Sequence, residues 1–343
     1  MSAFIVTLLS IPPIIRLIKK YRLYDMPGNR KEHSHPIPTM GGISIAAGMV
    51  VALLLWFPFI AEPAQISFFF SIAVLLGLGI MDDLKDLSAR YKFIIQIAIG
   101  SLIAISGIRI TSLEGLMGIY DLSPIAQYSI TVLAIVGITN AFNLVDGIDG
   151  LAGGLGFMSL VTLGIILNLN GDINTALIAF ALSGGILAFL YFNFNPAKIF
   201  MGDTGSLVLG FVISVLSIRL LQVNHIASNP FIPNGPVFVF AITLIPVFDT
   251  LRVFGLRIWR GKSPFAADRT HIHHLLTNQG FNHSFATKAI CFLHAIIILE
   301  VCWLKSIRTE FLFVLLILVM ASATFTLKNL SVFIPKRKLA ENR

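Results

Sequence analysis

Long apolar segments separated by short polar connections run through the whole chain. Eleven of these segments approach the roughly 20 residues that a helix needs to cross the hydrocarbon core of a bilayer. They lie approximately at residues 3–18, 41–60, 66–81, 93–107, 126–142, 151–168, 173–192, 206–222, 237–254, 288–304 and 311–330. The pattern therefore predicts an all-α, polytopic membrane protein with about eleven transmembrane helices.

The first segment is the least regular, because it is short and contains two prolines and Arg16. No basic residue precedes it, and Lys19 and Lys20 follow it. This arrangement is typical of a membrane anchor with its N-terminus outside, and not of a cleaved signal peptide. If this segment is not a full span, the predicted number of transmembrane helices falls to ten.

Basic residues are distributed very unevenly between the two sets of connections. With the N-terminus outside, the connections that face the cytoplasm hold 21 of the 25 Lys and Arg residues, as the positive-inside rule requires. The net charge of +8 is thus mostly a consequence of topology, and we reject nucleic acid as a partner. Nearly all acids and most histidines lie in the same connections, so any active site is expected on the cytoplasmic face.

The composition agrees with this class of protein. Of the 343 residues, 56% are hydrophobic and 12% are charged, and the mean hydropathy is +0.86, values typical of polytopic helical membrane proteins. No repeat, low-complexity tract or separate soluble domain is visible, so residues 1–343 are interpreted as one integral-membrane domain. Cys291 and Cys302 lie on one predicted helix, roughly 16 Å apart along its axis, and cannot pair with each other.

The segment from Asn193 to Ser206, NFNPAKIFMGDTGS, has the pattern of an anion-binding turn. Gly202 and Gly205 permit a tight turn whose backbone N–H groups can face an anion, and Asp203 lies at its mouth. An acid beside an anion site requires a cation between them, which favours an Asp–Mg²⁺–phosphate arrangement. A helix N-cap formed by the Asp or Ser is the alternative for this segment alone.

The third apolar segment ends in the acidic string MDDLKDLSARYK. Asp82 and Asp86 are spaced to share a helix face, with Asp83 one step round. Three carboxylates at a membrane boundary raise each other's pKa values unless cations intervene, which predicts a divalent ion or a shared proton. A solvated helix end is the alternative. The string also matches the DDxxD motif of isoprenyl diphosphate chemistry.

Two further cytoplasmic connections contain candidate binding or catalytic residues. In NLVDGIDG, Asn143, Asp146 and Asp149 follow a helical spacing that suits metal, ribose or base hydrogen bonding, while the spacing of a calcium loop is absent. The long basic connection contains DRTHIHH, with these polar residues: Asp268, Arg269, His271, His273 and His274. A zinc site there is the alternative, but no cysteine is nearby, so the histidines and Arg269 fit better as donors to a diphosphate.

Together, these connections offer acids for Mg²⁺, cations for phosphate, and one exposed aromatic residue, Phe200, suited to stacking on a base. A membrane protein with such a face is expected to handle a soluble nucleotide-linked donor and a lipid acceptor. The predicted reaction is phosphoryl transfer, in which a metal and cations neutralise the developing charge.

The four motifs together resemble the polyprenyl-phosphate N-acetylhexosamine-1-phosphate transferase superfamily (glycosyltransferase family 4) over nearly the whole chain. HIHH with Asp268 and Arg269 is most similar to bacterial undecaprenyl-phosphate N-acetylglucosamine-1-phosphate transferases. The phospho-MurNAc-pentapeptide transferase is similar elsewhere, but Ile272 interrupts its histidine run. The resemblance implies transfer of a sugar 1-phosphate from a UDP-sugar to undecaprenyl phosphate, with release of UMP, at the bacterial cytoplasmic (inner) membrane. It also implies the first membrane step of cell-surface polysaccharide synthesis, with N-acetylglucosamine as the best estimate of the sugar.

The resemblance also implies roles for individual positions. Asp203, with help from Asn143, would ligate Mg²⁺ or Mn²⁺, and Phe200 would stack on uracil. Asp82 and Asp83 would be catalytic residues at the metal and lipid-phosphate site, where one of them would serve as base for the acceptor phosphate, and Lys92 would contact phosphate. The remaining positions are nucleoside or catalytic-loop residues (Asn193, Asp146 and Asp149) and diphosphate or sugar contacts (Arg269, His271, His273 and His274), of which His273 and His274 are expected to be catalytic.

Several alternatives stay open at this point. The lipid phosphate can attack the donor directly, or a covalent aspartyl-phosphate can form through Asp82 or Asp83. A membrane prenyltransferase is suggested by DDLKD alone, and a secondary transporter would need ionisable residues near helix midpoints. The sequence does not specify which sugar is used or which surface polymer is supplied, and it admits a homodimer.

Overall fold

The computed structural model describes residues 1–21, 24–25, 36–227, 230–263 and 270–329. In this part of the chain nearly all regular structure is α-helical. The helices are α1 (Ser2–Tyr21), α2 (Gly41–Trp56), α3 (Pro63–Lys85), α4 (Ala89–Ile105), α5 (Pro124–Val145), α6 (Leu151–Leu169), α7 (Ile173–Asn193), α8 (Gly202–Ile226), α9 (Gly235–Trp259), α10 (Ile272–Thr277), α11 (His283–Trp303) and α12 (Thr309–Lys328). A single 3-10 turn, η1 (Leu116–Gly118), and two short antiparallel strands, β1 (Tyr24–Asp25) and β2 (Ile37–Pro38), complete the described elements.

Each of the eleven predicted apolar segments forms a helix, which confirms the all-α polytopic architecture. Within the described residues, nine helices are long and apolar enough to cross a membrane, α1 among them. The exceptions are α2 and α4, with 16 and 17 residues. Helices are the expected solution, because lipid offers no hydrogen-bonding partners and every backbone group must be satisfied within the segment.

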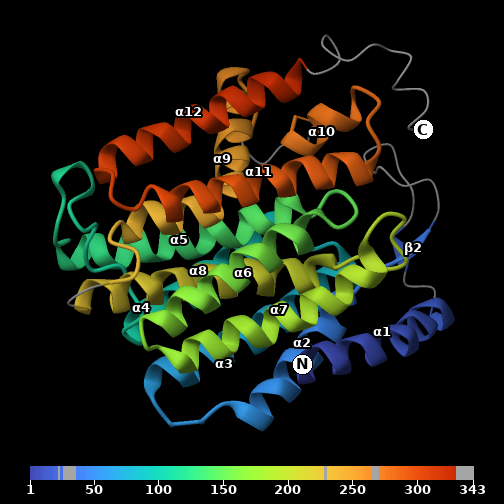
Figure 1. Cartoon of the computed structure of the whole chain (residues 1–343). Coiled ribbons are helices and arrows are strands. Elements are labelled where there is room, and N and C mark those ends of the chain that lie inside the picture. The colour runs from blue at the N-terminus through green and yellow to red at the C-terminus, as the bar shows by residue number, and fades with distance from the viewer. Residues whose placement is uncertain (22–23, 26–35, 228–229, 264–269, 330–343) are drawn as a thin grey trace.

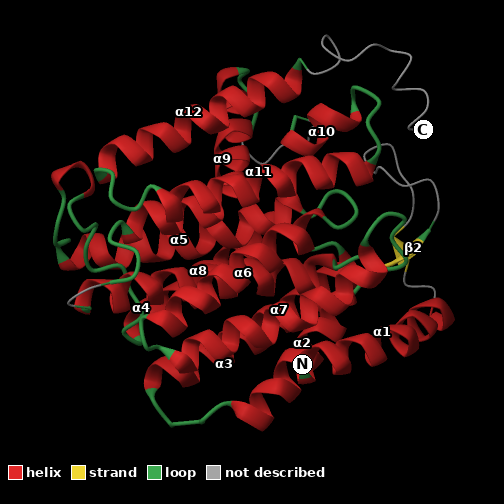
Figure 2. Cartoon of the chain, in the orientation of Figure 1, coloured by secondary structure: helices red, strands yellow, loops and turns green. Residues whose placement is uncertain are grey.

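The helices form one bundle in which α8 occupies the centre (Figure 1, Figure 2). It packs against α2, α3, α5, α6, α7 and α9, and its apolar residues are buried almost all round. A helix that is apolar on every side belongs in such a core. In contrast, α1, α4 and α12 have large faces with exposed apolar side chains, as expected for the rim of a membrane bundle.

Three helix ends meet at the beginning of α8. The N–H groups of Gly41 and Gly42 in α2 donate to the carbonyls of Phe200 and Met201, at 2.8 and 3.0 Å. A Cβ on Gly42 would lie 2.2 Å from the backbone nitrogen of Gly205. These close backbone contacts place the segment before α8 at the same end of the bundle as the N-terminus of α2, and Gly79 near the C-terminus of α3 lies against Thr204 at the same end.

The opposite end of the bundle carries different chemistry. There Arg219 of α8 pairs with Asp172 at 2.7 Å, beside a cavity of about 160 Å³ that is otherwise lined largely by apolar side chains. This cavity contains none of the predicted site residues. The predicted active residues therefore have to be sought at the other end.

Candidate functional site

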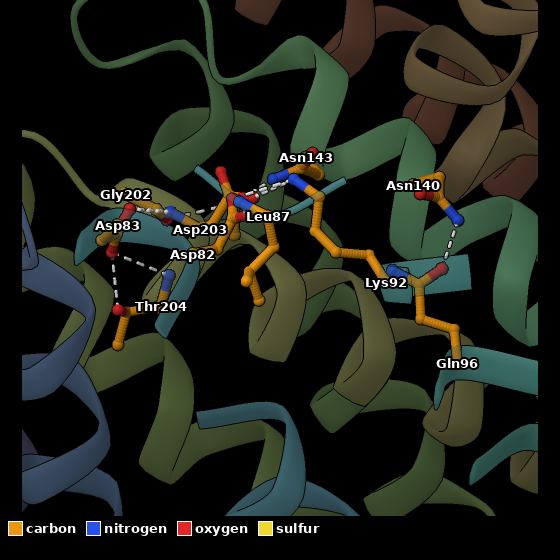
Figure 3. A network of polar contacts seen from close by, with 11 residues as sticks. Asp82, Asp83, Leu87, Lys92, Gln96, Asn140, Asn143, Gly202, Asp203 and Thr204 are labelled. Atoms are coloured by element: carbon orange, nitrogen blue, oxygen red, sulfur yellow. Dashed lines mark hydrogen bonds and ion pairs between the residues drawn. The ribbon is translucent and has the colours of Figure 1, made fainter. Parts of the chain in front are cut away.

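Two of the predicted acids meet around one lysine (Figure 3). The Nζ atom of Lys92 in α4 lies 2.8 Å from Oδ2 of Asp82 and 2.8 Å from Oδ2 of Asp203. Asp82 comes from the last turns of α3 and Asp203 from the first turn of α8, so three helices contribute to one point. Because the Asp82 and Lys92 side chains are largely buried, this charge pairing is screened less than a pair at the surface.

The end of α3 differs from the sequence prediction at Asp86. The helix stops at Lys85, and Asp86 adopts a left-handed conformation with φ of 51°. The chain then turns back, so that the N–H of Leu87 donates to Oδ1 of Asp82 at 2.8 Å. The prediction that Asp86 shares a helix face with Asp82 was wrong, and with it the structural basis of the DDxxD interpretation is lost.

Asp83 faces the first turn of α8 (Figure 3). Its carboxylate accepts the backbone N–H groups of Asp203 at 2.9 Å and Thr204 at 3.1 Å, and the Thr204 hydroxyl at 2.6 Å. The predicted turn does present N–H groups to an anion, but in this structure the anion is the chain's own carboxylate. The alternative of a local cap is not realised, because the N-cap residue Met201 makes no side-chain cap bond.

Asn143 approaches the same point from α5. Its Nδ2 group donates to the Ser206 hydroxyl at 2.9 Å, and its side chain also hydrogen-bonds the Asp203 carboxylate. The fold therefore brings together the two predicted metal ligands, Asn143 and Asp203, which lie sixty positions apart in the sequence.

The donor set at this point fits Mg²⁺. Asp82 and Asp203 already converge on one cationic group, and carboxylate and amide oxygens are the ligands that a hard cation prefers. No group of three or more His, Cys, Asp or Glu side chains within the described residues has the arrangement of a metal cage. Such a cage is not required, because Mg²⁺ usually binds through one or two carboxylates together with substrate phosphates and waters.

The loop between α5 and α6 is not helical, which corrects the predicted helical spacing of its acids. The helix α5 ends at Val145, and α6 begins at Leu151 after a turn in which Gly150 has φ of 75°. Burial, and then the carboxylates of Asp203, Asp83 and Asp149, raise the pKa of Asp146 to about 7. The charges of the Asp203 and Asp83 carboxylates thus act on Asp146. An acid with a pKa near neutrality is suited to proton transfer.

Asp149 lies on the other side of the loop. Its carboxylate accepts the N–H of Ala197 and the Nδ2 group of Asn195, both at 3.0 Å, and lies 3.3 Å from Nδ1 of His283. Burial by itself would raise the pKa of Asp149, but the hydrogen bonds from His283, Ala197 and Asn195 lower it. Asp149 therefore ties the loop to two distant segments.

Asn193 and Phe200 lie on either side of the cis Asn195–Pro196 bond. Asn193 is buried, with its Oδ1 accepting the N–H of Gly150 and its Nδ2 donating to the carbonyl of Ile199, both at 2.9 Å. Phe200 is half-buried and not fully exposed as predicted, and its N–H donates to Pro38 in β2. Contact of either residue with a nucleoside stays a prediction.

The histidine motif forms the short helix α10 and its N-cap. Nδ1 of His271 lies 2.9 Å from Oδ2 of Asp249, and the other oxygen of Asp249 accepts the N–H of Ile272 and a guanidinium N–H of Arg252. The rings of His271 and His273 are stacked at 5.8 Å, and those of His273 and His274 lie 4.2 Å apart. Arg269 and Asp268 lie outside the described residues.

His273 is the member of the motif nearest to the acidic loop. A Cβ on Gly147 would lie 2.5 Å from its Nε2 atom, so the ring lies directly over the glycine beside Asp146. Burial, and then the neighbouring His274, lower the pKa of His273 to about 3, so this side chain is neutral at physiological pH. The structure thus places the histidine motif next to the loop that carries Asp146 and Asp149.

Three residues of the site were not singled out from the sequence: Thr204, His283 and Asn195. Thr204 could have been suspected, because a hydroxyl residue follows Asp203 in the first turn of a helix. His283 gave no signal, since its partner Asp149 lies 134 positions earlier in the chain. Such contacts between distant segments are not visible in residue patterns.

Comparison with known proteins finds one matching family model and several bacterial relatives. The family model of glycosyl transferase family 4 matches residues 65–221. A probable undecaprenyl-phosphate N-acetylglucosaminyl 1-phosphate transferase of Bacillus subtilis is 37% identical over 310 residues, which cover 89% of this chain and 84% of the relative. Undecaprenyl-phosphate alpha-N-acetylglucosaminyl 1-phosphate transferases of Escherichia coli K12 and Salmonella typhi are 33% and 34% identical, covering 82% and 86% of this chain and 76% and 80% of those proteins.

Proposed function

The chain belongs to glycosyl transferase family 4, and on that premise we propose that it transfers N-acetylglucosamine 1-phosphate from UDP-N-acetylglucosamine to undecaprenyl phosphate, with UMP as the second product. The chain is a multi-pass protein of the bacterial inner membrane. The observation that carries the proposal is the meeting of Asp82, Lys92 and Asp203 at one end of the bundle. The names of the relatives supply the acceptor and the sugar.

In the proposed reaction, an oxygen of the acceptor phosphate attacks the phosphorus that carries the sugar. A phosphorus–oxygen bond forms to the lipid, the bond to the bridging oxygen of the donor breaks, and UMP leaves with the electron pair. Both substrates are anionic, so the site has to bring negative groups together and neutralise the charge that spreads over the transferred phosphoryl group.

Mg²⁺, held by Asp203 and Asn143, would neutralise the diphosphate and orient it when bound. Lys92 contributes a second positive charge at the same point. In the structure this charge is shared between Asp82 and Asp203, and we infer that an incoming phosphate competes for it. Lys92 would then hold the acceptor phosphate in line with the donor. This alignment of the two substrates would lower the barrier to phosphoryl transfer.

The donor would bind over the loop between α5 and α6. Phe200 would stack on the uracil, and the histidines of α10, together with Arg269, would donate to the diphosphate or the sugar. His271 contacts Asp249 and its ring stacks on that of His273, and this buried arrangement supports a fixed orientation of the two rings. Neutral His273 retains one N–H for this purpose, whereas His271 donates its Nδ1–H to Asp249.

Direct attack by the lipid phosphate is the preferred mechanism. Asp82 has one oxygen bound to the N–H of Leu87 and the other to Lys92, and both oxygens of Asp83 accept hydrogen bonds from α8. A carboxylate engaged in this way is a weaker nucleophile than a free one, which argues against a covalent aspartyl-phosphate.

The test is a product assay with the purified, detergent-solubilised protein. A panel of UDP-sugars is offered with and without undecaprenyl phosphate, and nucleotides are separated after the reaction. UMP that appears only with the lipid, and most rapidly with UDP-N-acetylglucosamine, is expected. Release of UDP would mean that the sugar is transferred without its phosphate, and a lack of UMP, as expected of a prenyltransferase, would mean that no sugar phosphate is transferred; either result contradicts the proposal. The Asp203→Asn variant is the inactive control.

We further propose that the lipid product initiates a cell-surface polysaccharide and that the acidic end of the bundle faces the cytoplasm. The asymmetric distribution of Lys and Arg supports this orientation. Labelling of single cysteines introduced near Lys85 and near Asp121, in intact cells with an impermeant maleimide, tests it. We expect reaction only near Asp121, and the reverse result would invert the topology.

A further inference from the structure

The two adjacent acids at the end of α3 point to different partners (Figure 3). Asp82 contacts Lys92 and the N–H of Leu87. Asp83, about 100° further round the helix, accepts three hydrogen bonds from Asp203 and Thr204. Although the sequence makes the two acids appear equivalent, the structure gives them separate tasks.

The contacts of Asp83 are those of a helix N-cap supplied by another helix. The first N–H groups of a helix have no partners within it, and a side-chain oxygen normally satisfies one of them from the preceding residue. Here the N-cap residue Met201 makes no side-chain cap bond, and Asp83 takes two of these N–H groups instead. Its negative charge also lies at the positive end of the α8 dipole.

The position of Asp83 is determined by a glycine one turn earlier on the same face of α3. A Cβ on Gly79 would lie 2.4 Å from Cα of Thr204 and 2.6 Å from its nitrogen. A side chain there would push α8 away, whereas glycine lets the two backbones touch. Gly79 and Asp83, spaced i and i+4, therefore hold the first turn of α8 together.

Gly202 completes the contact from the side of α8. It has φ of 71°, and a Cβ at this position would lie 2.5 Å from Oδ2 of Asp83. Thr204 is fully buried, so its hydroxyl depends on Asp83 as its acceptor. The residue between them, Asp203, is the predicted metal ligand.

We propose that Asp83 is a positioning residue, which caps α8 and thereby fixes the carboxylate of Asp203, and that it is neither the base nor the nucleophile of the reaction. The capping part follows from contacts alone. Only the consequence for Asp203 rests on the proposed function.

Hydrogen–deuterium exchange of the peptide around Asp203 tests the cap without metal, substrate or turnover. Loss of an N-cap shifts local opening by about 2- to 30-fold, so Asp83→Ala is expected to speed exchange of the Asp203 and Thr204 amides about tenfold. Asn has one acceptor oxygen where Asp83 uses two, so Asp83→Asn should keep part of the cap and exchange faster than the wild type but more slowly than Asp83→Ala. The matched control is Asp82→Asn, which removes a neighbouring carboxylate that bonds neither amide.

Thr204 provides a second probe that leaves Asp83 intact. Thr204→Val removes the hydroxyl but keeps the volume, and Thr204→Ser keeps the hydroxyl. We expect faster exchange in the first and normal exchange in the second. In the Asp83→Ala background, Thr204→Val should add little, because residues that act through one contact are not additive.

Activity distinguishes positioning from chemistry. Asp83→Asn is expected to keep the rate within about tenfold of the wild type, while Asp83→Ala loses more and requires a higher Mg²⁺ concentration for half-maximal rate. A base or nucleophile would lose about a hundredfold or more in both variants. Unchanged exchange in Asp83→Ala, or an Asp83→Asn protein that is capped but inactive, would overturn the inference. If the wild type transfers no sugar phosphate at all, the proposed function fails, and the exchange experiment still decides the cap.

Discussion

Replacement of Asp146 by Asn should make the protein more stable at high pH. At low pH the substitution should change the stability less. Burial, and then the carboxylates of Asp203, Asp83 and Asp149, raise the pKa of Asp146 from 3.8 to about 7. Between these two values the folded protein binds a proton that the unfolded chain has released. The stability of the wild type therefore falls as the pH rises through this window, and Asn removes that dependence.

The size of the effect follows from the window. From pH 5 to about pH 7 the folded acid stays protonated over two pH units, each worth about 1.36 kcal/mol, so the upper limit is about 2.7 kcal/mol. Asp146 is only half-buried, and solvent screening reduces such an interaction to about 1 kcal/mol. For a chain of this size, that corresponds to a shift of roughly 2 °C in the unfolding midpoint.

The assay is thermal unfolding followed by circular dichroism at 222 nm, in metal-free detergent buffer at pH 5 and pH 8. Since membrane proteins often unfold irreversibly, all scans use one heating rate and only differences between variants are compared. The midpoint of Asp146→Asn minus that of the wild type is expected to be about 2 °C larger at pH 8 than at pH 5.

Asp149→Asn is the matched control from the same loop. Hydrogen bonds lower the pKa of Asp149 in spite of its burial, so its stabilising contribution is complete above the unfolded value and is lost only at more acidic pH. Its substitution should therefore lower the midpoint at both pH 5 and pH 8, without the stabilisation at pH 8 that is expected for Asp146→Asn. The reasoning is refuted if the Asp146→Asn difference is the same at both pH values, or is larger at pH 5.

The other expectations concern turnover and nucleotide binding. Asp203→Asn should abolish turnover while the helical content is unchanged, and normal activity at saturating Mg²⁺ would count against its role as a metal ligand. Phe200→Ala should weaken UMP binding, measured by calorimetry, by roughly 1–3 kcal/mol if the ring stacks on the base; unchanged affinity would mean that the ring only packs. Gly147→Ala should reduce activity as much as His273→Ala, because its Cβ would lie 2.5 Å from Nε2 of His273. A fully active Gly147→Ala protein would show that the position of this ring does not matter.

Much of the architecture could be predicted from the sequence alone because lipid offers the backbone no hydrogen-bonding partners. A segment in hydrocarbon must satisfy its own backbone, so apolar length is sufficient to predict helices. Successive spans alternate in direction, and motifs in every second connection must therefore meet at one end of the bundle. This reasoning correctly grouped Asp82, Asn143 and Asp203 before any contact was known.

The helix boundaries show where hydrophobicity stops being informative. The apolar pattern predicts a start at residue 206 for the central helix, whereas α8 begins at Gly202. Its first turn is polar and is stabilised by Asp83 from α3. Local composition cannot reveal a cap that is supplied 120 positions away.

The sequence by itself determined the class of protein, the helices and the end of the bundle at which the chemistry gathers, because these depend on solvent and connectivity. Only the tertiary structure decided what each acid does. Asp82 meets Lys92, Asp83 caps α8, Asp86 turns away, and Asp149 binds His283. Side-chain hydrogen bonds act over about 3 Å, so the role of each acid depends on the exact placement of its side chain. A residue pattern does not encode that placement.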